Sequence, residues 1–253
     1  MTFHRYVALG DSFTEGVGDP DPTCPNGLRG WADRVADVLA QESDDFGYAN
    51  LAIRGRKLAQ IVEDQVDAAV ALGPDLVTIH AGGNDVLRPR VDLDALARTY
   101  DDAIGRLSAT GARVVMFTIF DPGGSGIYGP MRGRMAIFNE WVREIADNRG
   151  AAIVDMWRMR DFEIPAVMDT DRMHLNGGGH AHMARAVLDA IGIRHELEPA
   201  TFEPLPTLRR REQLAANAQW TREFLVPWVH RRVTGRSSGD TVSPKRPDLG
   251  PVG

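Results

Sequence analysis

Residues 6–16 read YVALGDSFTEG, and this stretch sets the start of the fold. The apolar run 6–9 predicts a β-strand, which Gly10 ends. Ser12 follows directly and so lies at the carboxyl end of a strand, where open α/β sheets place their ligands. The stretch therefore predicts a first strand and a candidate nucleophile. Taken alone, the same residues also fit an ordinary turn in which Ser12 caps a helix.

Predicted strands and helices alternate along the next 180 or so residues. Short apolar runs predict four more strands, at 48–53, 76–79, 114–120 and 151–157. Apolar spacing or length predicts helices at 31–41, 58–70, 93–107, 131–148 and 178–191. Strands that alternate with helices of this length form βαβ units with right-handed crossovers. The sequence thus predicts an α/β fold with a five-stranded parallel sheet.

The composition is that of an ordinary globular protein. The chain has 253 residues, of which 43% are hydrophobic and 25% charged, and this length suits one α/β domain with an appendage. A net charge of −6 gives no global sign of binding to nucleic acid or an anionic membrane. The single cysteine, Cys24, excludes an intramolecular disulfide. With no apolar run near a membrane span and no signal-peptide pattern before Ser12, we expect a cytoplasmic protein.

The character of the chain changes after about residue 193. We expect a first domain at 1–195, a helical extension at 196–234 and an extended or disordered tail at 235–253. From Arg194 onward there are 10 basic and 7 acidic residues, against 19 and 28 before it. Pro227 should kink a helix over 209–233.

Three further motifs lie at predicted strand ends or helix starts. Asn84, in the run Gly-Gly-Asn-Asp at 82–85, offers an uncharged amide suited to a developing oxyanion. His174 can act as a general base, and Asp171, three residues before it, can orient its ring. Gly55 could present a backbone N–H to the same place. Each motif alone also fits a turn or a capping segment.

Together, in this order, the four motifs resemble the SGNH (GDSL-type) hydrolase family, over residues 6–193. The family's nucleophile block falls on residues 10–12, its oxyanion glycine on Gly55, its Gly-x-Asn-Asp block on 82–85 and its Asp-x-x-His block on 171–174. The resemblance implies a three-layer α/β/α sandwich of flavodoxin-like type. It also implies a catalytic triad of Ser12, His174 and Asp171. The oxyanion hole would combine the backbone N–H groups of Ser12 and Gly55 with the Asn84 side chain.

The expected activity is hydrolysis of small or medium acyl esters through an acyl-enzyme on Ser12, with no metal and no cofactor. Carbohydrate deacetylation and acyl transfer could use the same site. A binding module that has lost catalysis is the alternative from another class, although it would be expected to lose the serine, the histidine or the asparagine.

The segment after residue 193 lies outside the core family pattern and is similar to C-terminal extensions attached to some actinobacterial members. We expect its apolar stripe to dock on the hydrolase domain and its arginines to be solvated. Contact of residues 209–233 with a membrane surface, or binding of nucleic acid by this segment, is the less favoured interpretation. A small acyl ester is the expected partner, and the natural substrate and the oligomeric state stay open.

Overall fold

The structure is a computed structural model that describes residues 2–124, 128–160, 165–202 and 205–252. The predicted ranges 1–195, 196–234 and 235–253 each include at least one position outside that description. Within the described part, no helix is long and apolar enough to cross a bilayer.

The centre of the molecule is a mostly parallel sheet with the strand order β5-β4-β3-β1-β2-β6. Five parallel strands correspond to the five predicted ones: β1 (Arg5–Gly10), β2 (Gly47–Asn50), β3 (Leu76–His80), β4 (Arg113–Phe117) and β5 (Ala152–Val154). Gly10 lies opposite His80. The motifs that follow β1, β2 and β3 therefore meet at one edge of the sheet.

A sixth strand corrects the predicted count of five. β6 (Arg246–Gly250) comes from the predicted tail and pairs antiparallel with β2. Its sequence, RPDLG, has none of the alternation typical of a strand. Pro247 is tolerated because β6 is an edge strand, where one side of the backbone needs no partner.

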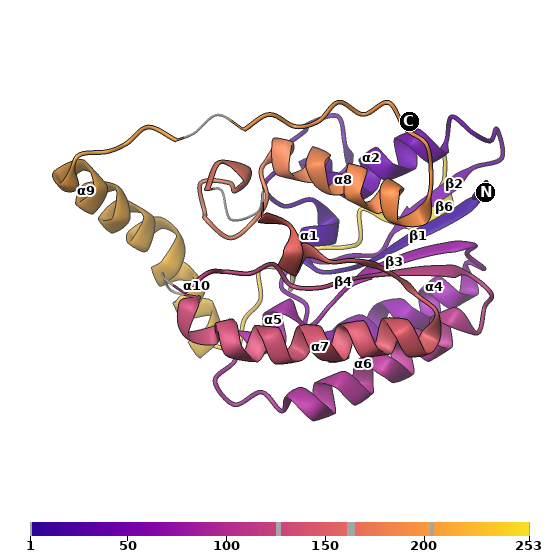
Figure 1. The fold of residues 1–253 in the computed structure, drawn as a ribbon, viewed down its shortest axis with the longest axis horizontal. Coiled ribbons are helices and arrows are strands. Elements are labelled where there is room, and N and C mark those ends of the chain that lie inside the picture. The colour runs from indigo at the N-terminus through magenta and orange to yellow at the C-terminus, as the bar shows by residue number, and fades with distance from the viewer. Residues whose placement is uncertain (1, 125–127, 161–164, 203–204, 253) are drawn as a thin grey trace.

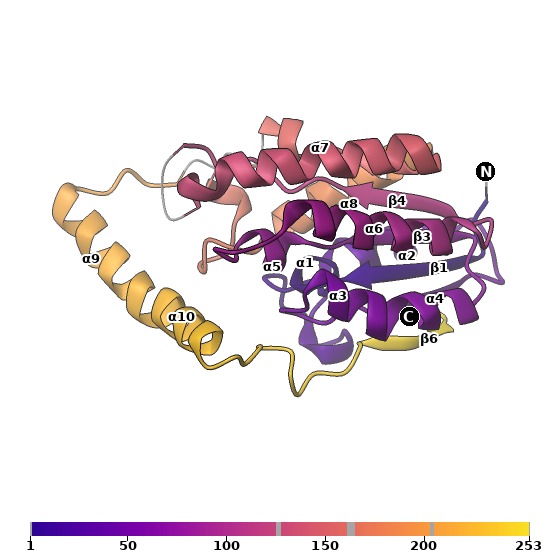
Figure 2. The ribbon, with the colours of Figure 1, turned by 90° about the horizontal axis from the view of Figure 1, so that it is seen from below.

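Helices cover both faces of the sheet (Figures 1 and 2). Side chains of β1 alternate between two cores, Tyr6 and Ala8 in one and Val7 and Leu9 in the other. Burial on both faces explains the continuous apolar run of this strand. One face carries α2 (Gly30–Leu39) and α8 (Gly177–Ile191); the other carries α3 (Leu58–Ile61), the π-helical turn η2 (Val62–Val66), α4 (Asp67–Ala71), α6 (Leu93–Ser108) and α7 (Arg132–Arg149).

Short helices fill the connections. α1 (Ser12–Glu15) and α5 (Gly83–Val86) begin at the carboxyl ends of β1 and β3. Among the described residues, 3₁₀ turns lie at Pro25–Gly27, Gly129–Met131, Met156–Arg158 and Pro165–Val167.

The extension forms a helix that stands over the end of the sheet where α1 and α5 begin (Figure 1). It consists of α9 (Arg210–Trp220), the π-helical turn η7 (Thr221–Leu225) and α10 (Val226–Val233). The π turn ends at Leu225, two residues before Pro227. Its wider winding is one way for a helix to pass a proline that lacks an N–H and crowds the preceding turn.

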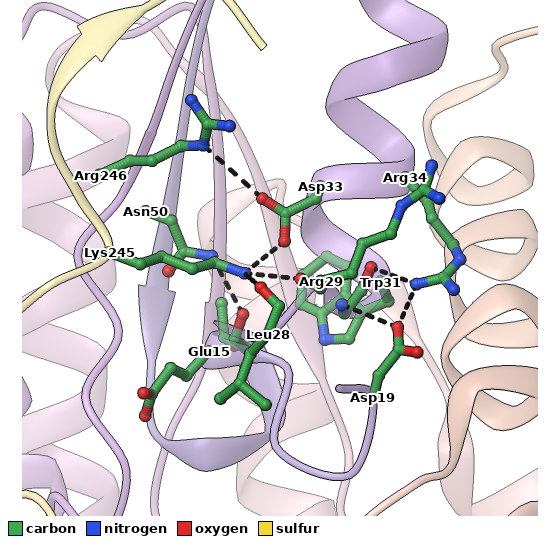
Figure 3. A network of polar contacts seen from close by, with 12 residues as sticks. Glu15, Asp19, Leu28, Arg29, Trp31, Asp33, Arg34, Asn50, Lys245 and Arg246 are labelled. Atoms are coloured by element: carbon green, nitrogen blue, oxygen red, sulfur yellow. Dashed lines mark hydrogen bonds and ion pairs between the residues drawn. The ribbon is translucent and has the colours of Figure 1, made fainter. Parts of the chain in front are cut away.

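The chain after the extension is anchored by a buried ion pair (Figure 3). The Lys245 side chain is fully buried and pairs with Asp33 of α2, whose side chain is 5% exposed. The same ammonium group donates to the backbone carbonyls of Arg29, at 2.6 Å, and Leu28, at 3.3 Å. Because β6 follows at once, the extension is held at both ends, by α8 and by the sheet edge.

Candidate active site

The end of β1 is fixed by contacts that are distant in sequence. Gly10 has φ 144°, and a Cβ there would lie 2.6 Å from the His80 carbonyl oxygen. Gln65, in the π turn η2, accepts from the Gly10 N–H at 2.8 Å and donates to the Gly10 carbonyl at 3.0 Å. Asp11 caps α1 by accepting from the Phe13 N–H. These contacts place Ser12 as the first residue of α1.

Ser12, His174 and Asp171 lie in one hydrogen-bonded chain. Ser12 Oγ is 2.9 Å from His174 Nε2, and His174 Nδ1 is 2.5 Å from Asp171 Oδ2. The other Asp171 oxygen accepts from the backbone N–H groups of Met173 and His174. Burial raises the pKa of Asp171, but the hydrogen bond and charge of His174 and the two backbone donors outweigh it and hold that pKa below its ordinary value. The carboxylate is therefore ionised at neutral pH, and both distances suit a nucleophile, a base and an orienting group.

The turn that carries Asp171 and His174 is held by the extension. Arg172 has φ 58°, a left-handed conformation that costs energy for a residue with a side chain. Its guanidinium donates to Asn217 at 2.9 Å and lies 5.1 Å from the centre of the Trp220 ring. Trp220 Nε1 donates to the Asp171 carbonyl at 2.9 Å. No motif in the sequence pointed to these contacts, which join residues 45 and 49 positions apart.

Gly55 lies on a loop that a buried carboxylate positions. Glu15, whose side chain is fully buried, accepts from the Arg54 backbone N–H at 2.7 Å and from its guanidinium. Gly55 has φ 75°, and a Cβ there would collide with the Ser237 hydroxyl. Within the described part of the chain, the N–H groups of Ser12 and Gly55 have no hydrogen-bond acceptor. Both are therefore available as donors beside the Ser12 hydroxyl.

Asn84 also lies beside Ser12, but its amide is already engaged. Its Nδ2 donates to Asp11 at 3.1 Å and to the Arg56 carbonyl at 3.0 Å. An amide nitrogen carries two hydrogens, so neither remains for a third acceptor in this arrangement. Asn84 would have to exchange one of these partners in order to donate to an oxyanion.

Two cavities meet at Ser12. The first, of about 110 Å³, is mainly apolar, and its walls include Phe13, Ile119, Phe120, Met135, Met156 and Met168. The second, of about 260 Å³, lies between the α/β domain and the extension, and Trp220, Trp228, Arg231 and Arg232 contribute to its wall. Ser12, Asn84, Met173 and His174 line both cavities. The Ser12 hydroxyl therefore lies between an apolar cavity and one that is lined by both polar and apolar side chains.

The expectation that the extension's arginines are solvated is wrong for Arg232. This half-buried side chain stacks on Trp228 at 3.8 Å and donates to the carbonyls of Leu87 and Asn84. The helix presents Trp220, Trp228, Arg231 and Arg232 to the site, while Leu214, at 61% exposed, and other apolar residues face outward. The simple expectation of an apolar face turned inward and a polar face turned outward missed this orientation.

Comparison with known proteins places this chain in a family. The model of the GDSL-like Lipase/Acylhydrolase family matches residues 8–182. The chain belongs to this family. Its members are hydrolases of acyl groups, so the chain is an ester hydrolase by family.

Relatives support the same placement. This chain is 34% identical over 217 residues to the uncharacterized protein YpmR of Bacillus subtilis (strain 168), and the match covers 73% of this chain and 80% of that protein. It is 26% identical over 207 residues to an acetylxylan esterase of Geobacillus stearothermophilus, covering 75% and 94%.

Solved structures show the same fold. LAE5, an alpha/beta hydrolase enzyme from the metagenome of Lake Arreo, Spain, is similar with a TM-score of 0.64 at 22% identity, over 78% of this chain and 99% of that one. Axe2, an acetylxylan esterase from Geobacillus stearothermophilus, is similar with a TM-score of 0.60 at 25% identity, over 77% and 98%.

Proposed function

We propose that this protein is a serine hydrolase that cleaves carboxylic esters through an acyl-enzyme on Ser12. The observation that carries the proposal is the chain from Ser12 Oγ through His174 to the ionised Asp171. In the first step His174 Nε2 takes the hydroxyl proton as Oγ attacks the acyl carbonyl. Asp171 stays ionised, fixes the imidazole tautomer and stabilises the imidazolium.

The negative charge on the tetrahedral intermediate needs hydrogen-bond donors at the attacked carbonyl oxygen. The backbone N–H groups of Ser12 and Gly55, which have no acceptor among the described residues, can take this role, and Asn84 joins them when it exchanges its contact with Asp11. Donors fixed in advance cost no reorganisation at the moment of reaction, and each is worth about 10²–10³ in turnover. His174 then returns its proton to the leaving alcohol, and water hydrolyses the acyl-enzyme.

The acyl group enters the apolar cavity. An apolar cavity of about 150 Å³ holds benzene, so a cavity of the present size, about 110 Å³, suits an acyl chain of roughly four to six carbons. The methionines in its wall, among them Met135 and Met156, adapt easily to chains of different shape. Deacetylation of a carbohydrate is a second candidate, favoured by the similarity to an acetylxylan esterase. Acyl transfer would use the same acyl-enzyme with another acceptor.

The test is hydrolysis of chromogenic esters from acetyl to long-chain by the wild type, Ser12→Ala and Ser243→Ala, which alters an exposed serine. We expect the highest kcat/KM at four to six carbons, loss of turnover in Ser12→Ala and normal turnover in Ser243→Ala. Turnover that survives in Ser12→Ala would reject Ser12 as the nucleophile. An acetyl optimum with activity on acetylated sugars would favour the deacetylase.

A further inference from the structure

The second cavity has an unusual charge balance. Arg88, Arg231, Arg232 and Arg236 all line it. Within the described part of the chain none of the four has a carboxylate within ion-pair distance, in contrast to Arg54, which pairs with Glu15. Four guanidinium groups beside one cavity repel each other, and Asp85, which acts on Arg88 and Arg232 from beyond ion-pair distance, offsets that repulsion only in part. An anionic ligand would relieve the repulsion that remains.

Acidic residues do not balance this charge from within the cavity. Asp171 is the only acidic residue among the described residues that line it, and its carboxylate is engaged with His174. Burial lowers the pKa of Arg232 to about 10, and the nearby charge of Arg88 contributes to the shift. The guanidinium is still charged at neutral pH, so the cavity is strongly positive when it holds no anion.

Arg232 is held in place rather than left free in water, and Arg88 is partly buried. Arg232 stacks on Trp228 and donates to the Asn84 carbonyl at 3.4 Å, which fixes it close to the nucleophile. Arg88 Nε is buried and has no hydrogen-bond acceptor among the described residues. Guanidinium groups bind phosphate oxygens in pairs of parallel hydrogen bonds, and fixing them in advance reduces the entropy lost on binding.

The cavity lies where the leaving group must go. Ser12 and His174 line both cavities, so an ester whose acyl chain fills the apolar cavity directs its alcohol into the other. We propose that the cavity between the hydrolase domain and the extension is the leaving-group subsite, and that it takes an alcohol bearing a phosphate. This inference rests on the proposed ester hydrolysis at Ser12. The substrate class is then an ester of a medium apolar acid with a phosphorylated alcohol.

The test compares two esters that differ only in the phosphate, 2-hydroxyethyl butyrate and its phosphate monoester. We expect the wild type to prefer the phosphorylated ester in kcat/KM by about tenfold or more, the factor that corresponds to about 1.4 kcal/mol. The preference should appear mainly in KM and should weaken as salt is added. In Arg231→Gln/Arg236→Gln the ratio between the two esters should fall close to one. Because both esters are measured with the same enzyme sample, the ratio of their kcat/KM values does not depend on the fraction of enzyme that is folded.

Arg222→Gln is the matched control, because Arg222 is an exposed arginine of the same helix that does not line the cavity. It should keep the full preference. A wild type that does not discriminate between the esters, or a preference that the double variant retains, would overturn the inference while leaving ester hydrolysis intact.

A binding measurement separates the two proposals if neither ester is cleaved. Inorganic phosphate should raise the Tm of the wild type and of Arg222→Gln, but not that of Arg231→Gln/Arg236→Gln. Phosphate stabilisation without turnover would reject the proposed function and retain the anion site. Equal Tm shifts in all three proteins would reject the anion site.

Discussion

The buried pair Lys245–Asp33 leads to a quantitative prediction about how the C-terminal segment is held. Lys245→Met removes an ammonium group that has two roles. It neutralises Asp33, and it donates hydrogen bonds to the backbone carbonyls of Leu28 and Arg29. Arg246 does not replace it, because its Nε is 3.8 Å from Asp33 and makes no hydrogen bond there. Breaking a buried pair by removal of one partner costs about 3–5 kcal/mol. We expect Lys245→Met to lower the free energy of unfolding by that amount.

A double-mutant cycle isolates the interaction from the loss of packing. Asp33→Leu should be as damaging as Lys245→Met, since it leaves a buried ammonium unpaired. The double variant leaves no unpaired charge, and its loss should be smaller than the sum of the single losses by at least about 2 kcal/mol. Lys57→Met is the matched control: Lys57 is the chain's other lysine and is exposed, so its change should stay within about 0.5 kcal/mol.

Urea unfolding followed by tryptophan fluorescence measures all four variants. The buried Trp31, two residues before Asp33, reports on this part of the core. A loss below about 1 kcal/mol in Lys245→Met, or single losses that simply add, would refute the reasoning. The chain would then be anchored by β6 pairing and not by the ion pair.

Two other predictions concern the site and its support. Glu15→Gln weakens the contacts that position Arg54, so the Gly55 N–H should move out of place and kcat should fall about 10²-fold. Steady-state kinetics would check this, and a kcat within threefold of the wild-type value would contradict it. Burial lowers the pKa of His180 from 6.5 to about 4. As the pH falls from 7 to 4, the unfolded chain therefore protonates this histidine before the folded protein does. The folded protein should lose about 3 kcal/mol of stability over this range. Urea unfolding at several pH values should show a shallower dependence in His180→Gln but not in His230→Gln, which alters an exposed histidine; equal dependence in wild type and His180→Gln would contradict the assignment.

The parallel strands and the order of the motifs could be predicted from the sequence for one physical reason. A strand buried on both faces reads as a continuous apolar run, as residues 6–9 do. In a parallel sheet the carboxyl ends meet at one edge, so residues that follow different strands, such as Ser12 and Asn84, can be expected to lie together. Local pattern and this rule of topology are sufficient for these predictions.

Contacts between buried polar groups could not be predicted in the same way. Gln65 is 55 residues from the Gly10 backbone that it holds, and Glu15 is 39 residues from Arg54. No sequence periodicity marks such residues, because burial of each polar side chain depends on a hydrogen-bonding partner that is distant in sequence. β6 was missed for a related reason: it is stabilised by β2 and by an ion pair that spans 212 residues, not by an apolar pattern of its own.

The extension also limits what can be inferred from relatives. The family match ends at residue 182, before the extension begins, yet Trp220 and Arg232 form part of the cavity wall beside Ser12. Relatives can therefore share the hydroxyl, the imidazole and the carboxylate without sharing the space that we propose as the leaving-group subsite. Because specificity depends on that space and not on the fold, a relative's substrate is informative about this chain's chemistry and much less about its choice of ester. Under the proposal made above, the residues that α10 brings to the site contribute to that choice, and they are the ones to change first.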